Sequence, residues 1–181
     1  MKVTRTEIPD VLVLEPRVHQ DERGFFLENY NRRTFNEATG LDVQFVQDNQ
    51  SFSVHNVLRG LHYQIRQPQG KLIQAMAGEI YDVAVDLRRG SPTFAKWIGV
   101  NLSGGTHRMI WIPPGLAHGY LVLSEHAIVF YKTTDFYAPE HERTLLWSDP
   151  TLDIRWPLED KPIVSDKDRR GVTLASADVF D

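Results

Sequence analysis

The chain has 181 residues, no cysteine, 41% hydrophobic and 24% charged residues, and a formal net charge of −4. This length suits one domain with a substantial core, and we expect residues 1–181 to form a single domain. The lack of cysteine excludes disulfides, thiolate nucleophiles and thiolate metal ligands. Acidic balance and scattered basic residues argue against a nucleic-acid partner. Neither an apolar signal core nor a membrane-length apolar run is visible, so we expect a cytoplasmic protein without membrane contact.

Short runs of aliphatic residues alternating with polar or small ones recur along the chain, which is the period of a half-buried strand. We expect strands over residues 11–17, 25–30, 45–53, 57–64, 71–77, 81–87, 94–102 and 108–112, and two more within 120–133. Turn signals such as Gly78-Glu79 and Ser103-Gly104-Gly105 separate these runs. The pattern predicts an all-β, antiparallel sandwich or barrel.

One helix interrupts this pattern. We expect it over residues 32–39, ending at Gly40, where a left-handed cap suits glycine. From Pro139 onward, four prolines and many charges predict an irregular segment with a helical turn, packed across the main body.

Three charged or titratable side chains lie close together in otherwise strand-like sequence. Arg59, His62 and Lys71 fall within thirteen residues, and Gly60 and Gly70 accompany them. Such a set can hold an anionic ligand and move a proton. A single His or Lys on a strand is more often solvated or hydrogen-bonded structure, but three together favour an active site.

A second motif runs over residues 111–119 and ends in Ala117-His118-Gly119. It resembles the second motif of the cupin superfamily, in which that His is a metal ligand. A metal-binding cupin also needs an earlier His-x-His, whereas here His62 is followed two positions later by Gln64. The ammonium of Lys71 has no lone pair and repels a cation, so the pattern predicts a metal-free site. A hydrogen-bonded core role for His118 stays open.

Taken together, the motifs resemble the dTDP-4-dehydrorhamnose 3,5-epimerase family. The matching blocks are residues 23–28, 47–51, 58–64, 69–71, 111–113, 117–119, 131–132 and 165–168. The departures are Pro114, where Glu or Ala is more usual, and a short loop between His62 and Lys71, and neither removes a functional group. The resemblance implies a cupin-type antiparallel jelly roll with a few short helices, and no cofactor or metal.

The implied reaction inverts C3 and C5 of dTDP-4-dehydro-6-deoxy-D-glucose and gives dTDP-4-dehydro-L-rhamnose, a step of dTDP-L-rhamnose biosynthesis. Both carbons are alpha to the C4 ketone, so one base and one enolate-stabilising group can serve twice. His62 is the natural base, because imidazole titrates near neutral pH. The resemblance supplies Asp168 as its orienting carboxylate, with Asp82 as a competitor for that role.

Two further catalytic roles are carried over by resemblance. Lys71 would stabilise the negative charge that grows on the C4 oxygen, although a surface lysine after a loop is the plainer interpretation. Tyr131 would deliver a proton to the opposite face, although an aromatic barrel residue is the commoner role of a strand tyrosine.

The expected substrate-binding residues fall into groups with a shared task. Residues two apart on a strand share a face, so Gln47 with Asn49, and Phe26 with Glu28, can each line a pocket together. By resemblance these four hold the nucleoside, Tyr137 stacks on thymine, and the pyrophosphate or nearby sugar is contacted by Arg23, Arg59 and His118. The resemblance adds Glu142 and Lys167.

Arg59 and His62 are three residues apart, so a regular strand would aim them at opposite faces. The expected roles place both side chains in one site. We therefore expect a bulge or other irregularity at Gly60.

The resemblance also implies a homodimer, because in this family Arg23, Phe26 and Glu28 reach the pocket from the partner subunit through an exchanged N-terminal strand. Several alternatives remain: an epimerase acting at C3 or C5 alone, an isomerase of a related dTDP-keto sugar, and a non-catalytic sugar-nucleotide binding module. A metal-dependent cupin dioxygenase lacks its ligands. The order of the inversions and the preference for thymine over uracil are left open.

Overall fold

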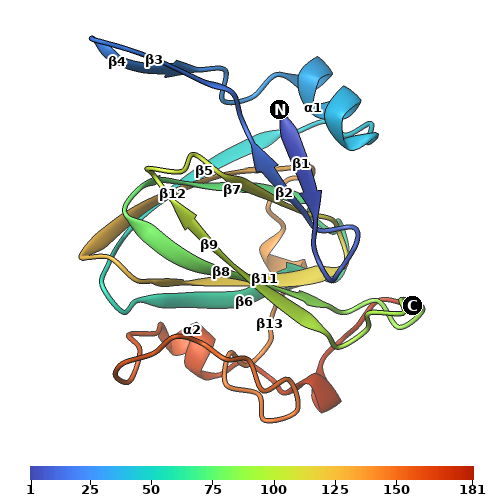
Figure 1. Ribbon diagram of the computed structural model, residues 1–181. Helices are drawn as coiled ribbons and strands as arrows, with labels where there is room; N and C mark the ends of the chain where they lie inside the picture. The colour runs from blue at the N-terminus through green and yellow to red at the C-terminus, as the bar shows by residue number, and fades with distance from the viewer.

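The computed structural model describes residues 1–181, in which two antiparallel sheets pack face to face (Figure 1). The larger sheet has six strands in the spatial order β1 (Lys2–Arg5), β2 (Leu12–Glu15), β10 (Met109–Ile112), β7 (Lys71–Ala77), β12 (His126–Thr133) and β5 (Gln47–Val54). The smaller has five strands, β13 (Glu142–Thr144), β6 (Leu58–Gln64), β11 (Leu116–Val122), β8 (Glu79–Asp86) and β9 (Trp97–Ser103). A separate hairpin pairs β3 (Val18–Asp21) with β4 (Gly24–Leu27). The all-β, antiparallel prediction is confirmed.

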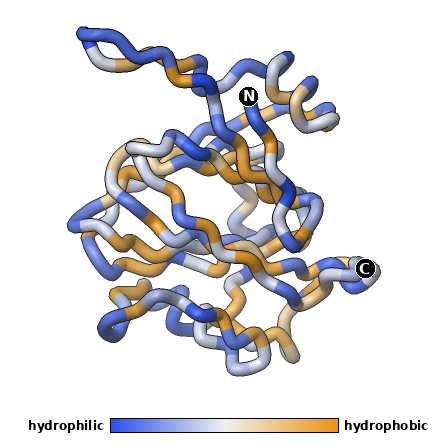
Figure 2. The backbone as a smooth tube through the Cα atoms, in the orientation of Figure 1, coloured by the Kyte–Doolittle hydropathy of each residue, from blue (hydrophilic) through white to orange (hydrophobic).

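The main core fills the space between the two sheets, because alternate side chains of each strand point inward. β5 shows this period directly, since its even-numbered residues from Asp48 to Val54 are exposed while the odd-numbered ones are partly or fully buried. The core joins aliphatic residues of both sheets, among them Ile73, Ala75, Ile110, Val129, Ile80, Ala84, Leu102 and Val122. Hydrophobic segments accordingly run along the strands of the sandwich (Figure 2).

Each sheet is also covered on its outer side. Helix α1 (Arg32–Thr39) buries Phe35 against Trp111 of the larger sheet, with the two rings edge to face at 5.9 Å. Asn31 caps its N-terminus by accepting from two backbone N–H groups, and Gly40 ends it with φ 72°. The predicted helix and its cap are therefore confirmed.

The C-terminal segment packs beneath the smaller sheet, as Figure 1 shows in orange and red. It contains two 3-10 turns, η1 (Pro139–His141) and η2 (Leu174–Ser176), and a four-residue helix, α2 (Asp166–Arg169). Leu145 and Leu152 join the apolar cluster under β6 and β8, and Trp97 donates its indole N–H to the Leu152 carbonyl at 2.9 Å. The irregular segment with a helical turn was predicted correctly.

Some strand bounds differ from the prediction. The strand expected over residues 25–30 ends at Leu27, so Glu28 lies outside it, and the strand expected from residue 94 begins at Trp97. Strands β1, β3 and β13 were not predicted. They have three or four residues each, too few to show a period, and β3 is exposed along its length.

The irregularity predicted in β6 is confirmed. His62 pairs with His118 and Arg59 pairs with Tyr120, so two residues of β6, Gly60 and Leu61, stand opposite one residue of β11. The Gly60–Leu61 peptide bond is cis. This bulge turns Arg59 and His62 toward the same side of the sheet.

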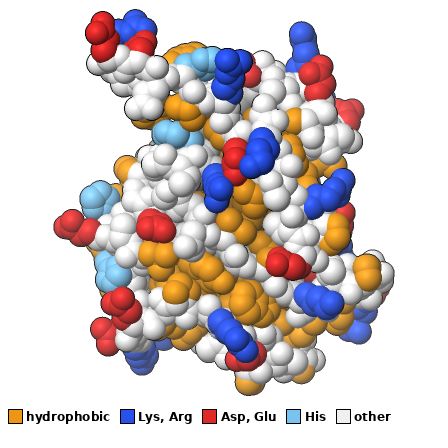
Figure 3. Space-filling view, in the orientation of Figure 1, with side chains coloured by type: hydrophobic (Ala, Val, Ile, Leu, Met, Phe, Trp, Pro, Cys, Tyr) orange, Lys and Arg blue, Asp and Glu red, His pale blue; other side chains and the backbone are white.

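The β3–β4 hairpin projects from the upper left of the body (Figure 1), and the ring centroids of Phe25 and His107 lie 4.5 Å apart. Phe25 and Phe26 are 61% and 71% exposed there. On the face shown in Figure 3, Lys and Arg alternate with Asp and Glu rather than gathering into a stripe. No helix is long and apolar enough to cross a membrane.

Candidate active site

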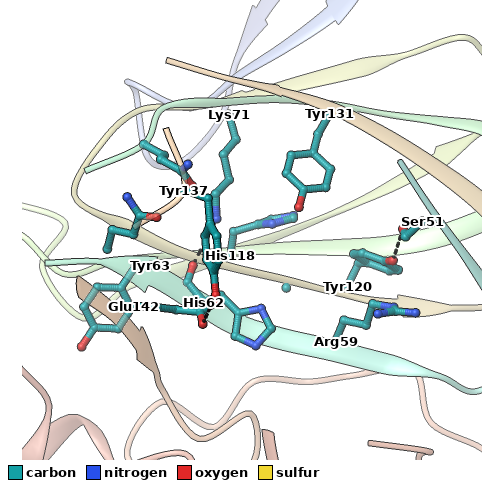
Figure 4. A pocket seen from close by; sticks show the side chains of 13 residues that line it. Ser51, Arg59, His62, Tyr63, Lys71, His118, Tyr120, Tyr131, Tyr137 and Glu142 are labelled. Atoms are coloured by element: carbon teal, nitrogen blue, oxygen red, sulfur yellow. Dashed lines mark hydrogen bonds between the residues drawn. The ribbon is translucent and has the colours of Figure 1, made fainter. Parts of the chain in front are cut away.

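A cavity between the two sheets gathers the side chains of both sequence motifs (Figure 4). Lys71 and Tyr131 enter it from the larger sheet, while His62 and His118 enter it from the smaller one. The lining comprises Ser51, Arg59, His62, Tyr63, Gln64, Gln69, Lys71, His118, Gly119, Tyr120, Tyr131, Tyr137 and Glu142. Seven of the fourteen expected site residues are among these.

His62 is paired with Asp168 and not with Asp82. The His62 Nε2 and Asp168 Oδ1 atoms are 2.6 Å apart, and Asp168 is held in turn by the Ser165 hydroxyl, which accepts from the Asp168 backbone N–H at 3.1 Å. Burial lowers the pKa of His62, and the bond to Asp168 opposes this effect in part. Burial raises the pKa of Asp168, but the hydrogen bond and charge of His62, together with the hydrogen bonds from Ser165 and the Gly60 backbone, leave this pKa below its ordinary value. His62 is therefore a neutral, oriented imidazole at pH 7.

Lys71 is buried at the start of β7, and its ammonium donates to the His62 carbonyl at 3.3 Å. Burial lowers the pKa of Lys71 to about 8, although the carboxylates of Asp82 and Glu142 act in the opposite direction. The group is still charged at neutral pH, and it faces the cavity with few competing partners. It can therefore stabilise an anion there.

Tyr131 points into the cavity from β12 and makes no hydrogen bond within the chain (Figure 4). Burial raises the pKa of Tyr131, Tyr120 raises it further and Arg59 lowers it. The phenol is thus protonated at neutral pH and able to donate. Because it comes from the sheet that faces His62, the two groups can approach a ligand from different sides.

Arg59 reaches the same cavity because of the β6 bulge. Its guanidinium donates to the Ser53 hydroxyl at 2.9 Å, and the remaining N–H groups leave it able to bind an anion. His118 stands beside it on β11 and is bonded through Nε2 to Asp82 Oδ2 at 2.8 Å. The structure therefore gives the two aspartates different histidines.

The mouth of the cavity is a network of the expected binding residues. Tyr137 is 53% exposed, its hydroxyl donates to Glu142 at 3.0 Å, and Lys167 donates to the other oxygen of Glu142 at 2.9 Å. Gln47 accepts from the Tyr137 backbone N–H and donates to Asn49 at 2.8 Å. Gln47 and Asn49 share the inward face of β5, as predicted.

Of the seven expected residues that do not line this cavity, three lie elsewhere on the surface of the chain. Arg23 forms an ion pair with Asp21 on the projecting hairpin, and Phe26 is largely exposed there. Glu28 instead contacts the start of α1 through Asn31. The monomer therefore brings Arg23, Phe26 and Glu28 to its surface and not to its own pocket.

Sequence reasoning missed five lining residues with polar side chains, Ser51, Tyr63, Gln64, Gln69 and Tyr120. Strand parity could have found three of them, because Ser51 shares a face with Asn49, Gln64 with His62, and Tyr120 with His118. The Tyr120 and Ser51 hydroxyls are 2.8 Å apart across the cavity. No three His, Asp or Glu side chains converge in a way that could hold a metal ion.

Comparison with known proteins identifies the relatives of this site. Residues 5–176 match the family model described as dTDP-4-dehydrorhamnose 3,5-epimerase. The chain belongs to that family. A Pseudomonas aeruginosa protein named dTDP-4-dehydrorhamnose 3,5-epimerase is 62% identical over 99% of both chains. As a member of this epimerase family, the chain is an isomerase.

Solved structures of the epimerase family share the whole fold. A Legionella pneumophila 3,5-epimerase in complex with dTDP-4-keto-L-rhamnose has a TM-score of 0.95 and 48% identity, covering 98% of this chain and 94% of that one. A 3'-monoepimerase from Streptomyces bikiniensis, in complex with dTDP-quinovose, has a TM-score of 0.90 and 34% identity. The match covers 97% of this chain and 88% of that one. Enzymes of both specificities therefore use this fold.

Proposed function

We propose that this chain epimerises dTDP-4-dehydro-6-deoxy-D-glucose at C3 and C5 to give dTDP-4-dehydro-L-rhamnose, as a cytoplasmic step of dTDP-L-rhamnose biosynthesis. The observation that carries the proposal is one cavity that holds an oriented imidazole, a buried ammonium and a protonated phenol. The names of the relatives support the choice of substrate.

In the proposed reaction His62 removes the proton from C3 or C5. Its Nε2 is bonded to Asp168, so Nδ1 is the nitrogen that accepts. The electron pair of the broken C–H bond moves into the enolate, whose negative oxygen at C4 is stabilised by the ammonium of Lys71. Asp168 keeps the ring in one tautomer and stabilises the imidazolium that forms.

Inversion requires that the new proton arrive on the face opposite to the one that lost it. His62 and Tyr131 stand on facing sheets, and this arrangement supports Tyr131 as the acid. The Tyr131 proton forms the new C–H bond while the enolate collapses to the ketone. His62 and Tyr131 then return to their starting protonation states through solvent before the second inversion.

We also propose that the substrate is held by two chains of a homodimer. Within one chain, Arg59 and His118 serve the pyrophosphate or sugar, while Gln47, Asn49 and Tyr137 serve the nucleoside, supported by the Glu142–Lys167 pair. The hairpin of a second copy, with the residue that follows it, would supply Arg23, Phe26 and Glu28. The exposure of Phe25 and Phe26 on a projecting hairpin supports this exchange, since such apolar surface normally has a partner.

The second candidate is epimerisation at one carbon only. It is favoured by the fold shared with the 3'-monoepimerase. The distinction depends on how the sugar sits between His62 and Tyr131.

Proton NMR of the substrate in heavy water tests the proposal. We expect deuterium at both C3 and C5 with the wild type, and loss of both exchanges with His62→Ala, because each abstraction uses the same base. His55→Ala is the matched control, since this exposed histidine bonds only backbone carbonyls remote from the cavity. Exchange at one carbon would establish a single epimerase, and exchange at neither would overturn the proposed substrate.

A further inference from the structure

Asp82 is a fully buried carboxylate that the proposed reaction does not use. It has 0% exposure and lies on β8, which pairs with β11, the strand that carries His118 and Tyr120 into the cavity. Its Oδ2 is bonded to His118 Nε2 at 2.8 Å, while its Oδ1 is buried without any hydrogen-bond partner. A buried carboxylate oxygen without a partner costs free energy, so some compensating interaction is expected close by.

The buried ammonium of Lys71, whose one hydrogen bond goes to the His62 carbonyl, is a charge that can supply this compensation. The titratable or charged groups around the Lys71 ammonium come from six elements: His62, Asp82, His118, Tyr131, Glu142 and Lys167. Of these, Asp82 exerts the largest favourable effect on the ammonium, ahead of Glu142, while Lys167 opposes it. Both oxygens of Glu142 are already bonded, to Lys167 and Tyr137. Asp82 is the carboxylate that has an oxygen without a hydrogen-bond partner.

We propose that Asp82 is a positioning residue that holds His118 through Nε2 and provides the counter-charge that keeps the buried Lys71 ammonium charged beside the reacting ketone. The inference rests on the proposed function insofar as it uses Lys71 as the enolate-stabilising group. Asp82 itself touches no substrate. It acts on the reaction through two side chains that line the cavity from different sheets.

The bond to Asp82 also fixes what His118 can offer a ligand. An ionised carboxylate can only accept, so the His118 proton sits on Nε2. Nδ1 is then the one ring nitrogen without a partner in the chain. The two histidine–aspartate pairs thus have different uses, since His62–Asp168 serves proton transfer and His118–Asp82 serves orientation and charge.

The pH profile of kcat/KM separates this role from mere structural support. Loss of the Asp82 charge makes the Lys71 ammonium less stable, so in Asp82→Asn the alkaline limb should move to lower pH by about one unit or more. Activity near pH 6 should fall much less than activity near pH 8. An unchanged alkaline limb in Asp82→Asn would overturn the proposal, whatever the loss in kcat.

Asp149→Asn is the matched control for removing a buried carboxylate. Asp149 is 1% exposed and accepts from the backbone N–H groups of Thr151, Leu152 and Leu174, away from the cavity. We expect this variant to lower the melting temperature without moving the alkaline limb. An equal shift in both variants would assign the effect to general destabilisation and contradict a specific role for Asp82.

A measurement without substrate keeps the inference separate from the proposed activity. In protein with 15N-labelled lysine, the NMR titration of Lys71, assigned with Lys71→Met, should have a lower midpoint in Asp82→Asn than in the wild type. The same midpoint would refute the counter-charge even if epimerisation is confirmed. If Asp82→Asn fails to fold, the 15N shifts of His118 in the wild type decide: a proton on Nε2 supports the inference, and a proton on Nδ1 overturns it.

Discussion

The His62–Asp168 pair joins residues 106 positions apart at 2.6 Å, and the rest of the site is organised around it. His62 lies in a strand motif that can be found in the sequence. Its partner Asp168 lies on a helix of four residues in an irregular segment, and no spacing rule connects that helix to β6. Only the family resemblance preferred Asp168 over Asp82, and the geometry agrees with that preference.

Asp168→Asn should lower kcat by about a hundredfold to ten-thousandfold, because the oriented, more basic imidazole is lost. The acid limb of kcat/KM should also move to lower pH. The Asp168 carboxylate raises the pKa of His62, so its removal lets that pKa fall further and extends the neutral base to lower pH. The measurement is the pH dependence of turnover under steady-state conditions.

Asp166→Asn is the control for this substitution. Asp166 lies on the same short helix, is exposed and pairs with Arg169 instead of His62. Its variant should keep both the rate and the acid limb of the wild type. A normal rate in Asp168→Asn would show that the base needs no carboxylate partner.

At the scale of elements, the bulge in β6 is what allows one strand to present both Arg59 and His62. Gly60 has φ 121°, and a Cβ there would stand 2.6 Å from the Gly119 Cα and 2.8 Å from the His118 carbonyl oxygen. Both neighbours are backbone atoms of β11 and cannot rotate away. The two strands therefore need glycine at this crossing.

Gly60→Ala should lower the free energy of unfolding by more than about 2 kcal/mol, since strained backbone and a backbone clash coincide. Urea denaturation followed by circular dichroism measures this. Gly105→Ala should change it by less than about 0.5 kcal/mol, because a Cβ at Gly105 meets nothing within 4 Å. Equal stability of the two variants would mean that β6 and β11 can separate at the bulge without cost.

Sequence predicted those elements that are specified locally. The α1 helix carries its own signals, a capping Asn31 and a terminal Gly40, and its bounds were correct. The bulge followed from the parity of two residues. By contrast, β13 forms because residues 142–144 pair with β6, which is far away in sequence. β3 has no buried face, so its sequence shows no alternation of apolar and polar residues. Pairing across the fold, and not local propensity, decides such short strands.

At the scale of the whole molecule, the β3–β4 hairpin is the part that one chain does not explain. Arg23 and Phe26 lie on it and Glu28 follows it directly, yet within the chain its strands pair only with each other, Phe25 contacts His107 at 4.5 Å between ring centroids, and none of these residues lines the cavity. An exchanged hairpin would complete two identical pockets at once, as a two-fold dimer requires.

Complementation between two defective chains tests the exchange. One variant, Arg23→Ala with Phe26→Ala, has an intact core but a defective hairpin, and His62→Ala has the reverse. In a mixed dimer with exchanged hairpins, the core that keeps His62 receives the intact hairpin, so one of its two pockets is whole. Random assortment makes half of the dimers mixed, so co-expression should restore about a quarter of the wild-type activity, although each variant alone is nearly inactive.

Separate affinity tags on the two chains verify that mixed dimers form. If they form and no activity returns, each pocket uses the hairpin of its own chain, and the exchanged dimer is wrong.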